Sequence, residues 1–86
     1  MDKEKKQVKA LVEGAFKHFG KDEIYEGQFI KYFKNKGLSK EEADQLGINA
    51  HAKRIIEIEI RPVISKGKTL KILGYVTVFI MADKKN

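Results

Sequence analysis

The feature that most constrains the fold is a stretch of strict alternation in the second half of the chain, residues 53–81. Ile56, Ile58 and Ile60 fall on one parity, and charged residues fall between them. A period of two residues is typical of a β-strand that buries one face. A second apolar run follows a turn-forming segment, so the sequence predicts an antiparallel β-hairpin with strands at about 54–64 and 68–81.

The length of the turn decides which residues of the two strands face each other. A three-residue loop of Ser65, Lys66 and Gly67 pairs Ile60 with Ile72 and Ile56 with Val76, which places the main apolar rows on one face. A two-residue loop would set Ile60 opposite Leu73 and mix apolar with polar rows. The sequence therefore favours the three-residue loop.

The second strand is apolar on both faces. With the register above, its inner row packs on the core, while Leu73, Tyr75 and Phe79 lie on the outer face. An exposed apolar row usually marks a further packing layer or a self-association surface. These three residues are the candidate interaction surface, and a homodimer through the second strand is one expectation.

Three helices are predicted before the hairpin. An apolar stripe that includes Val8, Val12 and Phe16 indicates a helix at about 3–19. Asp22 as N-cap and a broad aromatic face indicate a second helix at about 23–36. A capping box between Ser39 and Glu42 begins a third helix at about 39–46, which Gly47 is expected to end, with one further turn through Ala52.

The order of these elements defines the expected fold class. A chain of 86 residues makes one small domain. Three helices followed by an antiparallel β-hairpin give an α+β protein that resembles a winged-helix domain, in which the hairpin is the wing. The resemblance is one of topology and implies a nucleic-acid-binding function.

The formal net charge of +6 is concentrated near the C-terminus, because residues 61–86 contain six Lys or Arg against one acidic residue. Such clusters attract phosphate backbones or acidic protein surfaces, although a lysine-rich composition alone could also produce one. The third helix is acidic at Glu41, Glu42 and Asp44, so base reading by it is not expected. Phosphate contacts are expected from the hairpin tip and from outer lysines of the first two helices. The candidate residues are Arg61, Lys66, Lys68, Lys71, Lys31 and Lys34.

Other function classes have little support in the sequence. There is no glycine-rich phosphate loop, the two histidines are isolated, and there are no cysteines. We expect no enzyme activity, cofactor or metal site, no membrane association and a cytoplasmic location. The leading hypothesis is a small basic nucleic-acid-associated protein. The alternative is a protein-interaction or self-associating accessory or structural module, of viral or mobile-element origin, that uses the apolar outer face of the second strand.

Overall fold

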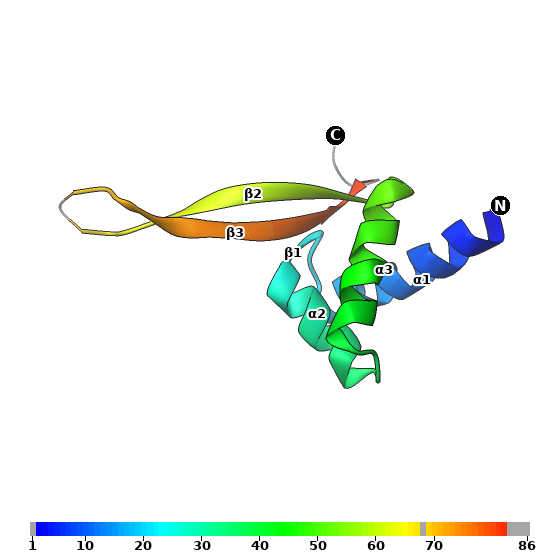
Figure 1. Ribbon diagram of the computed structural model, residues 1–86. Helices are drawn as coiled ribbons and strands as arrows, with labels where there is room; N and C mark the ends of the chain where they lie inside the picture. Colours follow the sequence, from blue (N-terminus) through cyan, green and yellow to red (C-terminus); the bar gives the residue numbers. More distant parts are fainter. Residues whose placement is uncertain (1, 68, 83–86) are drawn as a thin grey trace.

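The computed structural model describes residues 2–67 and 69–82 and shows an α+β protein. The predicted C-terminal tail at 83–86 lies outside the described residues. Helices gather at one end, and a long β-hairpin projects away from them (Figure 1). In chain order the elements are α1 (Asp2–Phe19), β1 (Glu23–Tyr25), α2 (Glu26–Asn35), α3 (Lys40–Ala52), β2 (Ile56–Ile64) and β3 (Ile72–Met81).

The sheet has three antiparallel strands in the order β1-β3-β2, so the prediction of a two-stranded hairpin alone was wrong. The extra strand β1 occupies residues assigned from sequence to the start of the second helix. It pairs with β3, where Ile24 lies opposite Phe79 and is buried. The helix begins only at Glu26, because the side chain of Gln28 accepts a hydrogen bond from the amide of Tyr25 at 2.9 Å. Asp22 is therefore not its N-cap.

The ends of α1 and α2 follow local sequence signals. Gly20 and Gly37 both take positive φ, of 67° and 101°, in the left-handed region that glycine enters without strain. Four residues separate α2 from α3, and the predicted capping box at the start of α3 is confirmed. The Ser39 amide donates to Glu42 Oε1 at 2.8 Å, and the Glu42 amide donates to Ser39 Oγ at 3.1 Å.

α3 continues to Ala52, so the expected stop at Gly47 was wrong. Gly47 is buried inside the helix, where its lack of a side chain lets the ring of Phe79 approach. Lys53 is the C-cap of the helix, and the next residue, Arg54, has a positive φ of 60°. A non-glycine residue in this conformation carries no sequence signal for a helix end.

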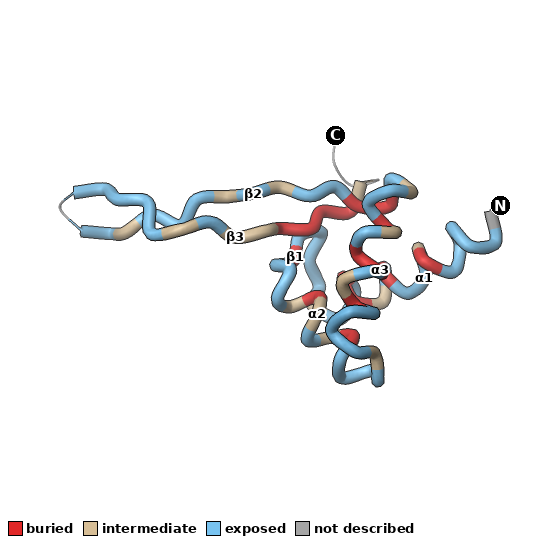
Figure 2. Tube along the Cα trace, viewed as in Figure 1, coloured by how far each residue is buried: buried red, intermediate tan, exposed pale blue. Residues whose placement is uncertain are grey.

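One hydrophobic core forms where the helices cover the base of the sheet. Figure 2 shows buried residues only in the helical body and at the base of the hairpin. The buried cluster takes its members from all six elements and from the turn before β2: Val8, Val12, Ala15, Phe16, Ile24, Phe29, Phe33, Ala43, Leu46, Ala50, Ile55, Ile56, Phe79 and Met81. The capped helices are thereby held on one side of the sheet.

The predicted register of the hairpin was wrong. Ile56 pairs with Met81 instead of Val76, and Ile60 pairs with Thr77 instead of Ile72. The loop is longer than three residues, because Ile64 pairs with Ile72 and the Ser65 amide donates to the carbonyl of Lys71 at 2.9 Å. The shift is five residues, an odd number, so it exchanges the two faces of β3 relative to β2.

The outer part of the hairpin extends beyond the core as an arm, here defined as residues 58–77. No described residue between 57 and 77 is buried (Figure 2). The molecule measures 52 × 31 × 22 Å, and its radius of gyration is 14.4 Å. A compact domain of this length would have a radius of gyration of about 12 Å. The arm accounts for the elongated shape.

Candidate functional site

The end of the arm carries two exposed lysines. Lys66 and Lys71 lie in the loop between β2 and β3, residues 65–71. Ser65 organises this loop, since its hydroxyl donates to the carbonyl of Thr69 at 3.3 Å and accepts from the Lys71 amide at 3.2 Å. Lys68, the third lysine predicted at the tip, lies outside the described residues. The tip therefore presents at least two cations at the far end of the molecule.

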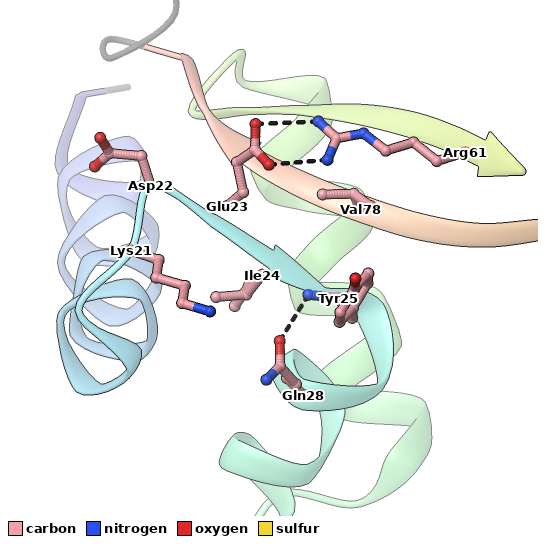
Figure 3. A pocket seen from close by; sticks show the side chains of 8 residues that line it. All are labelled: Lys21, Asp22, Glu23, Ile24, Tyr25, Gln28, Arg61 and Val78. Carbon is pink, nitrogen blue, oxygen red and sulfur yellow. Dashed lines mark hydrogen bonds and ion pairs between the residues drawn. The ribbon is translucent and has the colours of Figure 1, made fainter. Parts of the chain in front are cut away.

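Unlike the two tip lysines, Arg61 is paired with acidic side chains. Its Nη1 and Nη2 donate to the two carboxylate oxygens of Glu23 at 2.9 and 3.0 Å (Figure 3). Its Nε donates to Glu59 Oε1 at 2.8 Å. The hydrogen bonds to Glu23 and then to Glu59 raise the pKa of the guanidinium. Two carboxylates outweigh one cation, so this cluster disfavours a phosphate. Arg61 ties β2 to β1 across β3.

A pocket of about 250 Å³ lies beside this cluster, between β1 and the start of α2 (Figure 3). Its lining combines the acidic Asp22 and Glu23 with Lys21, Arg61 and uncharged side chains. Val78 forms part of the lining and is itself buried, so the ion pair shields an apolar residue on the sheet face away from the core cluster. The geometry and the mixed charge indicate a structural clamp.

The outer lysines of α2 lie apart from the arm tip. Lys31 and Lys34 are exposed on the helical body, from which the arm projects (Figure 1). Lys31 lines a shallow depression with the aromatic rings of His18 and Tyr32, and Lys36 Nζ lies 5.4 Å from the centre of the Tyr32 ring. Of the five predicted phosphate-contacting residues that the structure describes, it thus brings together two, Lys66 and Lys71, at the tip.

The first turn of α3 is acidic and already engaged. Glu42 caps the helix, and Glu41 is exposed beside it. Negative charge stabilises a helix N-terminus through the macrodipole, but it opposes a phosphate approaching the same turn. The first turn of α3 thus carries charge of the same sign as a phosphate.

With the observed register, the three residues of the predicted interaction surface do not lie on one exposed face. Leu73 and Tyr75 are exposed, at 68% and 66%. Phe79 is buried, and its ring lies edge-on to Phe29 with 4.9 Å between the ring centroids. Phe79 faces the helices because the odd shift turned its row toward the core, so the three residues form no common exposed row.

A groove that the sequence did not reveal lies between the helices and the root of the arm. It has a volume of about 400 Å³ and is lined by residues of α2, α3 and the sheet. Phe29 and Phe79 contribute apolar walls, and Ile48 on α3 is 59% exposed at its edge. Glu26 and Asp44 also line it. The groove depends on two features that the sequence predicted wrongly, because α3 continues past Gly47 and the register of the hairpin turns Phe79 toward the helices.

Two further observations concern the described part of the chain. No group of three or more His, Asp or Glu side chains there could hold a metal ion. No helix there is both long and apolar enough to cross a bilayer. Comparison of the chain with protein-family models, curated proteins and solved structures finds no match.

Proposed function

We propose that this protein is a winged-helix-like nucleic-acid-binding domain that contacts phosphates through the tip of its arm. The element order α1-β1-α2-α3-β2-β3 supports this, with β2 and β3 as the wing. α2 and α3 are joined by a short turn that contains Gly37, as in a helix-turn-helix. The alternation predicted a hairpin, the order of the elements suggested a likeness to a wing, and the hairpin projects from the helical body (Figure 1).

The observation that carries the proposal is the position of Lys66 and Lys71. Both are exposed at the end of an arm that extends past the helical body, and within the described residues neither side chain forms an ion pair. A projecting tip can follow a nucleic-acid backbone without a clash from the body. Cations so placed displace condensed counterions, and this release drives sequence-independent binding.

The contacts are of the positioning type and do not read bases. Phosphate contacts by lysine fix orientation but carry no sequence information. The helix in the place of a recognition helix is acidic in its first turn, so it adds no major-groove contacts. We expect non-specific affinities, with dissociation constants of about 10⁻⁴ to 10⁻⁶ M at physiological salt.

The test is a salt series of binding to a fluorescent duplex. The Lys66→Glu/Lys71→Glu variant should bind much more weakly than the unchanged chain. A companion variant with each lysine changed to Gln should lower the slope of log K against log salt by about 2, one for each lost phosphate contact. The matched control is Lys5→Glu/Lys6→Glu, which changes the same charge on exposed residues of α1. Equal loss in both Glu variants, or no binding at low salt, would overturn the proposal.

A second candidate function, a self-associating accessory or structural module, is favoured by one separate observation. The arm exposes large apolar side chains along its length, among them Ile60, Ile72 and Tyr75 at 59–66% exposure. Monomeric soluble proteins rarely leave such an extended apolar surface uncovered. This candidate does not depend on nucleic-acid binding.

A further inference from the structure

We propose that two copies of this chain associate by exchanging arms, so that the tip of each arm docks in the groove between α2, α3 and the sheet of the other copy. The proposal identifies the surface, the partner and the pairing of charges. It rests on the groove and on the arm, and it stands whether or not the protein binds nucleic acid.

The groove and the apolar side of the arm form one continuous surface. Ile58 and Thr77 line the groove, and Thr77 is the pairing partner of Ile60. Because residues two apart in a strand share a face, Ile60 and Tyr75 continue the same face outward from the groove. Along β2, Ile64 continues this face toward the tip, and the irregularity in the register after Val63 sets Ile72 opposite it.

The two ends of this surface, the groove and the tip of the arm, carry opposite charges. The groove contains Glu26 and Asp44, and within the described residues neither carboxylate forms an ion pair. The arm ends in Lys66 and Lys71, next to Leu70, which is 75% exposed. An apolar groove with acidic side chains thus matches an apolar tip with basic side chains.

A second copy of the chain can pair with both ends of this surface, because its groove accepts the tip and its tip reaches the groove. A two-fold axis across the middle of the arm stacks the apolar faces of two arms in antiparallel directions, and each tip then reaches the groove of the partner. Such an interface is isologous, so each tip–groove contact occurs twice. A parallel arrangement would instead bring the basic tips together and leave the acidic grooves empty. Nucleic acid fits the groove and the adjoining face of the arm poorly, because the groove is acidic and the face of the arm is apolar.

The oligomeric state measured by sedimentation across a concentration series tests the surface. The unchanged chain should form dimers, and Ile60→Lys should weaken the dimer at least 100-fold by placing a charge in the stacked faces. The matched control is Leu11→Lys, which replaces a 52% exposed apolar residue on α1 outside the proposed interface. A chain that stays monomeric at millimolar concentration, or equal disruption by both variants, would overturn the proposal.

A charge exchange tests the pairing of tip and groove. Asp44→Lys and Lys71→Glu should each weaken the dimer about tenfold, because each sets like charges against each other at both contacts. The double variant Asp44→Lys/Lys71→Glu restores opposite charges and should recover most of the affinity. Recovery separates a contact between copies from a loss of folding, which circular dichroism of each variant also checks. A double variant as weak as the singles would show that the tip docks elsewhere.

Discussion

At the scale of a residue, Gly47 shows that tertiary packing can keep a glycine inside a helix where the sequence alone predicts a helix end. A Cβ at this position would lie 3.3 Å from Cε2 and Cζ of Phe79 and 3.6 Å from Cε1 of Phe29. The helix continues through Gly47, and packing against these rings stabilises it at a position where the intrinsic helix propensity of glycine is low. The same residue keeps α3 near enough to the sheet to form one wall of the groove.

Comparison with Gly27 gives a prediction about stability. Gly27 lies in α2, and a Cβ there would meet no heavy atom within 4 Å. Gly27→Ala should raise the free energy of unfolding by about 0.5–1 kcal/mol through helix propensity. Gly47→Ala should gain less, and Gly47→Leu should cost about 1–3 kcal/mol because it forces the two rings apart. Urea denaturation measures all three, and equal gains from both alanine variants would contradict the packing at Gly47.

Local chemistry explains which residue-level features the sequence could predict. The capping box of Ser39 and Glu42 needs only residues three apart, so its pattern can be read directly. Arg54 belongs to a local helix cap, in which its amide donates to His51 and the Ile55 amide donates to Ala50, but an arginine gives no sequence signal for a left-handed conformation. The ion pair between Glu23 and Arg61 depends on elements distant in sequence. Arg61 was therefore predicted to contact phosphate, although its main partner is a carboxylate 38 residues away.

At the scale of elements, the alternation predicted that a hairpin exists but not its register. β3 is apolar in both rows, so either row can face the core without an obvious penalty in the pattern. The observed loop spans residues 65–71 and is closed by hydrogen bonds of Ser65 to Thr69 and Lys71, so it is longer than the two- or three-residue turns that a sequence pattern indicates. The three-residue strand β1 was missed because it is stable only as a partner of β3.

The arm and the body should behave as separable elements. Replacing residues 62–75 by Asn-Gly joins Arg61 to its partner Val76 through a two-residue turn and keeps the clamp to Glu23. Because no described residue of the removed segment is buried, the melting temperature should change by only a few degrees. Calorimetry and circular dichroism measure this. Loss of cooperative unfolding would show that the arm contributes to the core.

The same truncation distinguishes the functions assigned to the arm from those of the body. The shortened chain lacks the tip lysines and most of the apolar face, so it should neither bind a duplex through the tip nor form the exchanged dimer. Binding that persists unchanged would assign the duplex contacts to the helical body, where Lys31 and Lys34 lie.

At the scale of the whole molecule, one tip serves two proposed partners. The tip lysines contact phosphates in one case and the groove of a second copy in the other. A tip docked beside Glu26 and Asp44 is not accessible to a duplex, so the two associations exclude each other. Thermodynamic linkage then requires that each partner weakens the other by the same factor.

A competition experiment tests this exclusion. A short duplex, added in excess at low salt, should shift the sedimentation of the unchanged chain from dimers toward single chains bound to duplex. High salt should remove the effect, because the duplex then dissociates as counterions return to its phosphates. Lys5→Glu/Lys6→Glu is the control, since it leaves both tip and groove intact and should show the same shift. A complex in which the dimer binds duplex with an unchanged dimer dissociation constant would show that the tips remain accessible, which contradicts their docking in the grooves.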